Sequence, residues 1–263
     1  MGQQMEKLAA ADALRPVARR LRMLGVVPGD LNSFLRLVKV RHGIGRGEAV
    51  VGSIRSTKHF TMLLEGLACT SIRHEDGARQ IYSFCHPGDF VCLHRYVFPL
   101  SDEDLEVEAL ASCSIATIDY QSADQIVERH PPLGRALWLA AMIETNIART
   151  RLAAMRWPAM RRIAHLLCEQ LTRRLACGID NGVIPINQLE LADATGLSVV
   201  HTNRIVQDLR KLGVLSKKRH IVEVVNKEHL QELAAFDARY LTVDECLSRW
   251  SVRPLVSGLP LST

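Results

Sequence analysis

Several features that define other classes of protein are absent from this chain of 263 residues. It has no apolar run of about 18 residues, which excludes a transmembrane helix. Its N-terminus carries Glu6, Lys7 and Asp12 instead of the apolar segment of a secretory signal. There is no Walker motif, no G-x-S-x-G, no G-x-G-x-x-G after a strand, and no His-x-His pair of the kind that a cupin-type enzyme uses. We therefore expect a cytoplasmic protein that is not an enzyme and has no membrane partner.

Close pairs of cysteines are also missing. The seven cysteines are odd in number and form no C-x-x-C pair, which argues against a disulfide framework or a zinc ribbon. In a reducing compartment we expect them to be buried as small apolar side chains. A thiol switch remains an alternative, because Cys85, Cys92 and Cys113 fall in predicted strands of one region.

The composition is that of a globular chain, and its length suggests two domains. Hydrophobic residues make up 48% and charged residues 23%, which excludes a disordered chain. The net charge of +5 is concentrated in residues 158–227, which hold 11 Lys and Arg against six Asp and Glu. A nucleic-acid-binding face would place its positive charge in this way.

The N-terminal half divides into a helical segment and a β-rich region. Residues 1–30 carry apolar side chains at helical spacing up to Pro28-Gly29 (Leu14, Val17, Ala18, Leu21 and Leu24). In residues 31–130, short apolar runs alternate with turn signals, and Asp76-Gly77 between two such runs predicts a β-hairpin. Many short strands at this spacing predict a small antiparallel sandwich or barrel.

A long helix is expected over residues 131–157, because Pro131-Pro132 suits a first turn and Pro158 marks an end. One set of residues has the 4-3-4-3-4 spacing of a coiled-coil seam and is predicted to join two copies: Ala136, Ala140, Ile143, Ile147, Thr150 and Ala154. A second apolar set is expected to cover the β-rich region: Leu133, Leu137, Trp138, Ala141 and Leu152. The alternative is that the first set packs on the chain's own β-rich region.

Two short helices joined by a tight turn are predicted within residues 158–236. Asn187 and Glu190 have the spacing of a capping box, which opens a helix with Leu189 and Ala192 facing inward. Gly196 turns the chain and Ser198 is a good N-cap for the next helix. A buried stripe at i, i+4 and i+7 follows, up to Gly213 (Ile205, Leu209 and Leu212). This arrangement is a helix-turn-helix.

The second of these helices is predicted to enter the major groove of double-stranded DNA. Its outward residues at the start are the candidate base contacts: Val199, Val200, Asn203 and Arg204. Arg204 can bind guanine bidentately and Asn203 can pair with adenine, whereas a valine can contact a thymine methyl group. Thr202 is expected to face the protein.

Contacts to the DNA backbone are expected from the ends of this unit. Val214-Leu215 and residues 221–225 predict two strands of a wing with a basic turn between them. The candidate phosphate contacts are Ser198 and His201 at the helix start, and Lys217, Lys218 and Arg219 in the turn. Residues 237–263 form a C-terminal extension to which the sequence assigns no role.

The helix-turn-helix residues resemble those of the Crp/Fnr superfamily of bacterial transcription factors, in the form common among alphaproteobacteria. The similar segments are residues 191–204 and 209–215, together with Leu64-Glu65-Gly66-Leu67-Ala68-Cys69, residues 76–81 and His86-Pro87-Gly88-Asp89-Phe90. The resemblance covers residues 35–225. It implies an α+β fold with an N-terminal antiparallel β-roll, a long dimerisation helix and a C-terminal winged helix-turn-helix.

The same resemblance implies a homodimer that reads a pseudo-palindromic operator, with RNA polymerase as a further partner. It also places base contacts at Val199, Val200, Asn203 and Arg204. Val200 stands where many relatives carry Glu, and a valine cannot accept from cytosine N4. The preferred half-site is therefore expected to differ from the one that those relatives read.

The resemblance does not extend to the family's known effector sites. Cyclic-nucleotide binders carry Gly-Glu and later Arg-Ser, where this chain has Val91-Cys92-Leu93 and the acidic segment 102–108, with five acids in seven residues. Those acids would repel a phosphate, so cyclic AMP is not expected to bind. No cysteine precedes Cys69, so the N-terminal iron–sulfur scheme does not transfer. A haem-, metal- or thiol-based sensor is the alternative, with candidate haem ligands at His42, His59, His74, His86 and His94.

Overall fold

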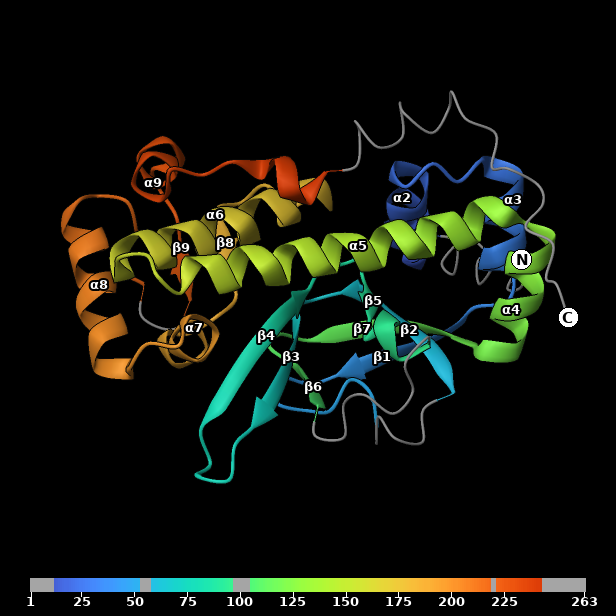
Figure 1. Ribbon diagram of the computed structural model, residues 1–263, viewed down its shortest axis with the longest axis horizontal. Helices are drawn as coiled ribbons and strands as arrows, with labels where there is room; N and C mark the ends of the chain where they lie inside the picture. Colours follow the sequence, from blue (N-terminus) through green and yellow to red (C-terminus); the bar gives the residue numbers. More distant parts are fainter. Residues whose placement is uncertain (1–11, 53–57, 97–104, 219–220, 243–263) are drawn as a thin grey trace, which may run out of the picture.

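The computed structural model describes residues 12–52, 58–96, 105–218 and 221–242. Figure 1 shows the helix α5 (Pro131–Ala154) running along the molecule, with a β-roll on one side and a helical head domain at one end. Within these ranges, no helix is long and apolar enough to cross a bilayer. The architecture is the α+β arrangement that the sequence predicts.

Two short helices open the described chain. Helix α2 (Arg15–Met23) buries the predicted apolar stripe, since Leu14, Val17 and Leu21 are each at most 7% exposed. Pro28 does not end the helical segment as predicted, because it occupies the first turn of a second helix, α3 (Pro28–Leu35). The first strand starts at Lys39, after α3.

Two antiparallel sheets form the β-roll. One has the order β1-β7-β2-β5 and the other β4-β3-β6. The strands are β1 (Lys39–Ile44), β2 (His59–Glu65), β3 (Ala68–Arg73), β4 (Arg79–Cys85), β5 (Phe90–Val91), β6 (Leu105–Ala109) and β7 (Cys113–Asp119), with the 3-10 turn η2 (Leu93–Tyr96) after β5. The predicted hairpin is present: β3 and β4 pair in antiparallel fashion. Gly77, in the turn between them, has φ +81°.

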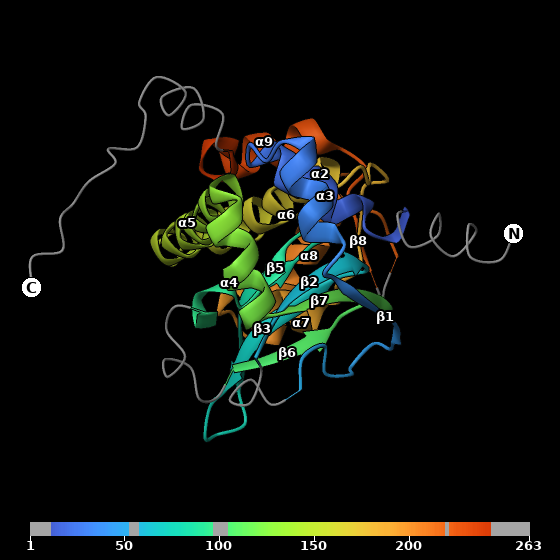
Figure 2. The ribbon, with the colours of Figure 1, turned by 90° about the vertical axis from the view of Figure 1, so that its right-hand side faces the viewer.

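A helix that the sequence analysis missed links the roll to α5. Helix α4 (Tyr120–Arg129) is capped by Asp119, whose side chain accepts a hydrogen bond of 2.8 Å from Ser122 N. Its residues had been assigned to the roll. Together α2, α3, α4 and α5 enclose one apolar core against the first sheet, and Figure 2 shows α2 and α3 on the opposite side of the molecule from β6.

The predicted division of α5 into two apolar faces is only partly observed. Leu133 and Leu137 belong to the core shared with the roll, and Ala141 packs against it, as expected. Four residues of the predicted seam belong to the core shared with the roll and the N-terminal helices: Ala136, Ala140, Ile143 and Ile147. Ala154 is also buried, at 5% exposed. These five side chains are therefore not available to a second copy. Thr150 is half-buried. From the set that was expected to face the roll, Trp138 is 50% and Leu152 is 74% exposed. The alternative considered above, in which the seam residues pack on the chain's own roll, is the one observed.

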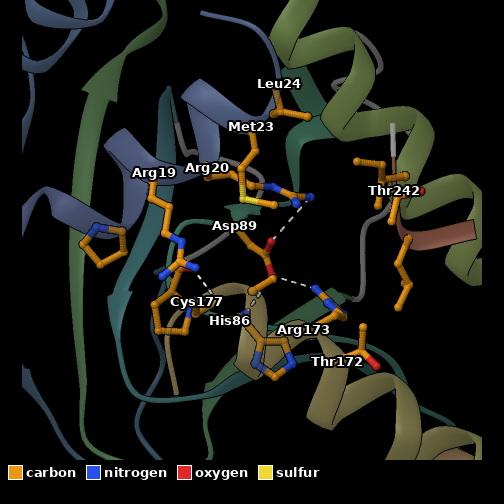
Figure 3. Close-up of a pocket in the computed structure, with 15 residues that line it drawn as sticks. Arg19, Arg20, Met23, Leu24, His86, Asp89, Thr172, Arg173, Cys177 and Thr242 are labelled. Carbon is orange, nitrogen blue, oxygen red and sulfur yellow. Dashed lines mark hydrogen bonds and ion pairs between the residues drawn. The ribbon is translucent and has the colours of Figure 1, made fainter. Parts of the chain in front are cut away.

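The head domain begins with α6 (Ala159–Ala176), around which a second apolar core forms that also includes roll residues such as Leu67, Ile81 and Phe84. The remaining elements are β8 (Val183–Ile184), α7 (Gln188–Thr195), α8 (Val199–Lys211), β9 (Val222–Glu223), α9 (Lys227–Ala234) and the 3-10 turn η3 (Ala238–Leu241). Beside this shared core, the described parts of the roll make polar contacts with the head domain on two sides. On one side they join β4 to α7, and on the other they join the turn at His86–Asp89 to α6 (Figure 3).

Candidate nucleic-acid interface

Helix α7 begins with the predicted capping box. Asn187 Oδ1 accepts from Glu190 N at 2.9 Å, and Glu190 Oε2 accepts from Asn187 N at 2.8 Å. Gly196 closes the helix in the left-handed region at φ +64°, a conformation that glycine adopts without strain. Leu189, predicted to face inward, is 52% exposed, and Leu191 fills the core in its place.

Helix α8 starts at Ser198, whose hydroxyl accepts from His201 N at 3.2 Å, as predicted for an N-cap. Its buried stripe consists of Thr202, Ile205, Val206 and Leu209. Thr202 thus faces the protein as expected, whereas Leu212 does not belong to the stripe and is 47% exposed. The stripe packs against α6 and α7, which fixes the direction of the opposite face.

That opposite face carries the four candidate base contacts. Val200 is 81% and Val199 is 43% exposed, and Asn203 and Arg204 are also exposed. All four lie in the first two turns of α8, which forms the outer edge of the head in Figure 1. A single helix face therefore presents two apolar groups, one amide and one guanidinium to a groove about 12 Å wide.

The wing is smaller than predicted. Its two strands meet in a single bridge between Leu215 and Val224, and β9 pairs instead with β8, a pairing that the sequence analysis did not include. Arg210 braces the turn by donating to Ser216 O at 3.0 Å and to Lys218 O. Lys217 and Lys218 are exposed, and Lys218 Nζ lies 2.9 Å from Glu223 Oε1. Arg219 lies outside the described residues.

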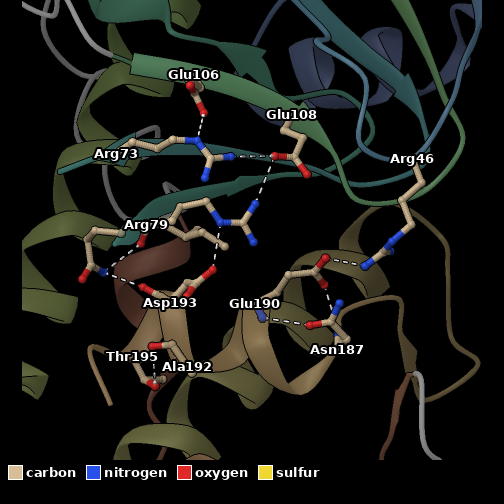
Figure 4. A network of polar contacts seen from close by, with 12 residues as sticks. Arg46, Arg73, Arg79, Glu106, Glu108, Asn187, Glu190, Ala192, Asp193 and Thr195 are labelled. Atoms are coloured by element: carbon tan, nitrogen blue, oxygen red, sulfur yellow. Dashed lines mark hydrogen bonds and ion pairs between the residues drawn. The ribbon is translucent and has the colours of Figure 1, made fainter. Parts of the chain in front are cut away.

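A polar network anchors the head to the roll next to α7 (Figure 4). Arg79 of β4 donates to Asp193 Oδ2 at 2.8 Å and to Glu108 Oε2 at 3.0 Å. Gln80 donates to the backbone oxygen of Asp193 at 2.8 Å. Arg46 pairs with Glu190, the same carboxylate that completes the capping box. The helix that braces α8 is thus held directly by the roll.

The acidic segment 102–108 does not face the roll interior in its described part. Val107 and Ala109 point into the roll core, and the alternating residues Glu106 and Glu108 point outward to Arg73 and Arg79. Residues 102–104 lie outside the described ranges. Repulsion by Glu106 and Glu108 therefore gives no reason against cyclic AMP, and its absence as an effector stays a prediction.

The described thiols have the character of packed apolar groups. Cys69, Cys85, Cys113 and Cys168 are buried, as expected, and no disulfide joins the six described cysteines. Burial raises the pKa of Cys69 and of Cys168 to about 12, and it also raises the pKa of Cys85 and Cys113. Because the thiolate is the reactive form, these surroundings do not favour the thiol-switch alternative.

The histidines considered as haem ligands lie in unlike surroundings. His86 is buried and its Nε2 lies 2.9 Å from Gln170 Oε1, whereas His42 Nδ1 lies 3.0 Å from Ser114 Oγ. His59 and His74 are exposed. Over the described ranges, no group of three or more His, Cys, Asp and Glu side chains is arranged to hold a metal ion.

Comparisons with known proteins agree with this architecture. Residues 161–233 match the Crp-like helix-turn-helix domain. The chain is 25% identical over 210 residues to the nitrogen fixation regulation protein FixK of Bradyrhizobium diazoefficiens, with 78% of this chain and 86% of FixK covered. It is 26% identical over 213 residues to the transcriptional activator protein FnrL of Cereibacter sphaeroides, with 78% of this chain and 84% of FnrL covered.

The fold is shared with the solved structure of FixK2 from Bradyrhizobium japonicum. The TM-score is 0.63 at 21% identity, over 74% of this chain and 96% of FixK2. The relatives are regulators and not enzymes. Together with the exposed face of α8 and its bracing by α7, these similarities support a DNA-binding transcription regulator of the Crp/Fnr type.

Proposed function

We propose that the protein acts as a homodimer whose two α8 helices read a pseudo-palindromic operator, and that the β-roll sets the position of the head domains. The observation that carries the proposal is the exposed quartet of Val199, Val200, Asn203 and Arg204 on the first turns of α8. In this proposal these four side chains contact base edges, and Ser198, His201, Lys217 and Lys218 contact phosphates.

The second copy would contact the outward face of α5. Six residues at a 3-4-3-4-3 spacing are exposed or half-buried in the single chain: Trp138, Ala141, Thr145, Ala148, Leu152 and Met155. This spacing matches a coiled-coil seam, and the small residues allow two helices to approach closely. The seam therefore moves by about two residues from the one that the sequence predicted, to the face that the roll leaves uncovered.

Regulation would act through the contact between β4 and α7. Because Arg79 and Gln80 of the roll hold Asp193 of α7, a change in the roll can tilt α7 together with the packed α8. Two heads held in different orientations bind an operator with different affinities, and a sensor signal shifts the population between them. RNA polymerase is the protein partner that the family resemblance leads us to expect.

The test of DNA reading compares two charge-removing variants of one helix. The probe is a palindromic duplex that the wild-type protein selects from a random pool. We expect Arg204→Ala to lower affinity for this duplex by about 10- to 100-fold, because a bidentate contact to guanine is lost. Lys211→Ala removes the same charge at the far end of α8, where the side chain is 77% exposed, and should change affinity by less than about threefold. Equal losses in both variants would contradict base reading by α8.

The test of the dimer uses the outward face of α5. Leu152→Glu places a charge in the proposed seam, whereas Asn146→Glu places one on an exposed position beside it. We expect sedimentation velocity to show a monomer for Leu152→Glu and a dimer for Asn146→Glu. A dimer that survives in Leu152→Glu would place the contact between copies elsewhere.

A further inference from the structure

A cavity of about 120 Å³ lies where three parts of the chain meet. Its walls come from α2, from the His86–Asp89 turn of the roll and from α6 of the head, and residues Leu241 and Thr242 close one side (Figure 3). A space of this size accommodates a molecule of about six non-hydrogen atoms. It lies outside the roll and is separate from the DNA-reading face.

The lining carries unbalanced positive charge. Of the described residues around the cavity, Arg19, Arg20 and Arg173 are cations, and the one acid is Asp89. Asp89 is already engaged, since Arg173 Nη2 lies 2.6 Å from its Oδ2 and Arg20 Nη2 lies 3.8 Å from its Oδ1. Burial raises the pKa of Asp89, but Arg173 and Arg20 outweigh this and hold it below its ordinary value. Two enclosed guanidinium groups, those of Arg20 and Arg173, therefore share one carboxylate, and the exposed Arg19 adds a third cation at the edge.

Neighbouring acids do not fully compensate the positive charge around the cavity. Burial and the charge of Asp89 raise the pKa of Glu144 to about 8, so this carboxyl is mostly protonated at neutral pH. Glu169 is bound by Arg151 at 2.7 Å and receives a hydrogen bond from Tyr240 at 3.1 Å, and it lies 3.8 Å from Arg173. Since uncompensated charge in a partly buried site is costly, the cavity favours an anion.

Buried hydrogen-bonding atoms at the cavity point to the same conclusion. Among the described residues, Arg20 Nε, Arg173 Nη1 and His86 Nδ1 are buried without a hydrogen-bond partner. Two of them are donors, as an oxyanion requires. Unsatisfied groups of this kind are uncommon in folded proteins, because each costs the free energy of its lost hydration.

His86 adds a requirement for a hydroxyl group. Gln170 donates through Nε2 to Glu169, so its Oε1 is the acceptor and His86 Nε2 carries the proton. Burial and Arg173 lower the pKa of His86 to about 3, so the ring is neutral and Nδ1 is an acceptor. His86 is 1% exposed and lines the cavity, so a donor for Nδ1 would have to come from the cavity side.

We propose that this cavity binds a small oxyanion that carries a hydroxyl group, either a short 2-hydroxycarboxylate or a hydrogen phosphate group. The oxyanion would contact the arginines, the hydroxyl would donate to His86 Nδ1, and any short carbon chain would lie against Leu24 and Ile143. Arg19 is exposed at the mouth and can approach the bound anion. Binding would connect α2, the roll and α6, and so link the sensor domain to the head.

The test is calorimetry on the full chain without DNA, so its outcome is independent of operator binding. Lactate and propionate form one matched pair, and phosphate and sulfate at pH 7 form the other, because only the first member of each has a hydroxyl group. We expect saturable binding of lactate or of phosphate below about 10 mM, with the hydroxyl-free partner at least about threefold weaker. Which pair responds identifies the carboxylate or the phosphate class. No saturable binding in either pair would overturn the proposal, and equal affinities within a responding pair would overturn the role of His86.

Two variants of α2 locate the binding. Arg19→Gln removes a cavity arginine, and Arg22→Gln makes the same change at an exposed position on α2 that does not line the cavity. We expect the anion to bind about tenfold more weakly to Arg19→Gln and with unchanged affinity to Arg22→Gln. Circular dichroism checks that both variants are folded. Wild-type affinity in Arg19→Gln, or an equal loss in both variants, would overturn the assignment.

Discussion

The roll meets the head domain at two contacts with opposite charge balance. At α7, each guanidinium group of the roll has a carboxylate partner, as Arg79 has in Asp193 and Arg46 has in Glu190. At α6, Arg173 and Arg20 share Asp89, and Arg19 lines the same cavity. A contact whose charges are matched within the chain has no charge left for a ligand, whereas an unmatched one can also bind an anion. We therefore expect an anion to strengthen the α6 contact and to leave the α7 contact unchanged.

The largest effect is expected from removing the shared acid on the α6 side. Asp89→Ala removes the carboxylate that Arg20 and Arg173 share and leaves Arg173 with Glu169 at 3.8 Å; the loss of one member of a buried pair costs about 3–5 kcal/mol. Urea titration should show this loss in the free energy of unfolding. Asp12→Ala is the control, because its pair with Arg15 is largely exposed and should contribute less than about 0.5 kcal/mol. A similar, small loss in both variants would remove the contrast between a buried and an exposed carboxylate.

A double-mutant cycle measures the matched contact at α7. The side chains of Arg79 and Asp193 are 12% and 13% exposed. We expect Arg79→Ala to lower the free energy of unfolding by about 2 kcal/mol, with a coupling energy to Asp193→Ala of about 1–2 kcal/mol. The exposed pair Arg15 and Asp12 should show a coupling below about 0.5 kcal/mol. A coupling near zero for Arg79 and Asp193 would mean that this contact does not fasten the head.

The smallest effect concerns pH and the neutral acid near the cavity. The pKa of Glu144 is raised to about 8 by burial and by Asp89, above its unfolded value of 4.5. The folded state then binds one proton more between these values, so this stability is present at pH 4.5 and is lost as pH rises through 8. Glu144→Gln cannot ionise. A pKa difference of this size corresponds to about 4 kcal/mol between pH 5 and pH 8.5, but Glu144 is only half-buried and solvent screens it, so we expect a gain over the wild type of about 1–2 kcal/mol. Chemical denaturation across this range checks it, and a pH-independent difference between the two proteins would contradict it.

The recognition helix was predicted well because its two faces differ in chemistry. Ser198 and Gly196 set its start through local rules, and polar residues such as Asn203 and Arg204 cannot belong to the core stripe. The errors in this region concern leucines at the ends of short helices. Leu189 and Leu212 fit the apolar spacing, but Leu189 lies in the first turn of α7 and Leu212 follows the last residue of α8, where a side chain can lie beyond the core that the middle of the helix contacts.

Helix α5 was assigned incorrectly because both of its faces are apolar. Ala136, Ala140 and Ile147 on one side differ little in character from Ala141, Ala148 and Leu152 on the other. Periodicity shows that two faces are covered, but it does not show which partner covers each one. One face of α5 is covered by the core that it shares with α2, α3 and α4. This packing joins segments far apart in the chain, so local sequence patterns do not predict it.

The cavity could not be predicted from spacing. It combines α2, the turn at residues 86–89, α5 and α6, which are up to about 160 residues apart in the chain. In the sequence, His86-Pro87-Gly88-Asp89-Phe90 was noted for its family resemblance and His86 as a candidate haem ligand, and neither indicated a cavity. Gly88, at φ +93°, brings this turn close to α2, since a Cβ there would lie 2.7 Å from Pro16 O.

Glu190 has two roles that differ in their chemical demands. Its carboxylate accepts from the backbone of Asn187 to start α7 and also pairs with Arg46 of the roll. An amide of equal length supplies the backbone acceptor without the charge, and a shorter acid supplies the charge without the reach. Comparing these two substitutions at residue 190 therefore separates the start of helix α7 from the attachment of the head to the roll. The same position allows a designer to weaken the attachment while the helix still folds.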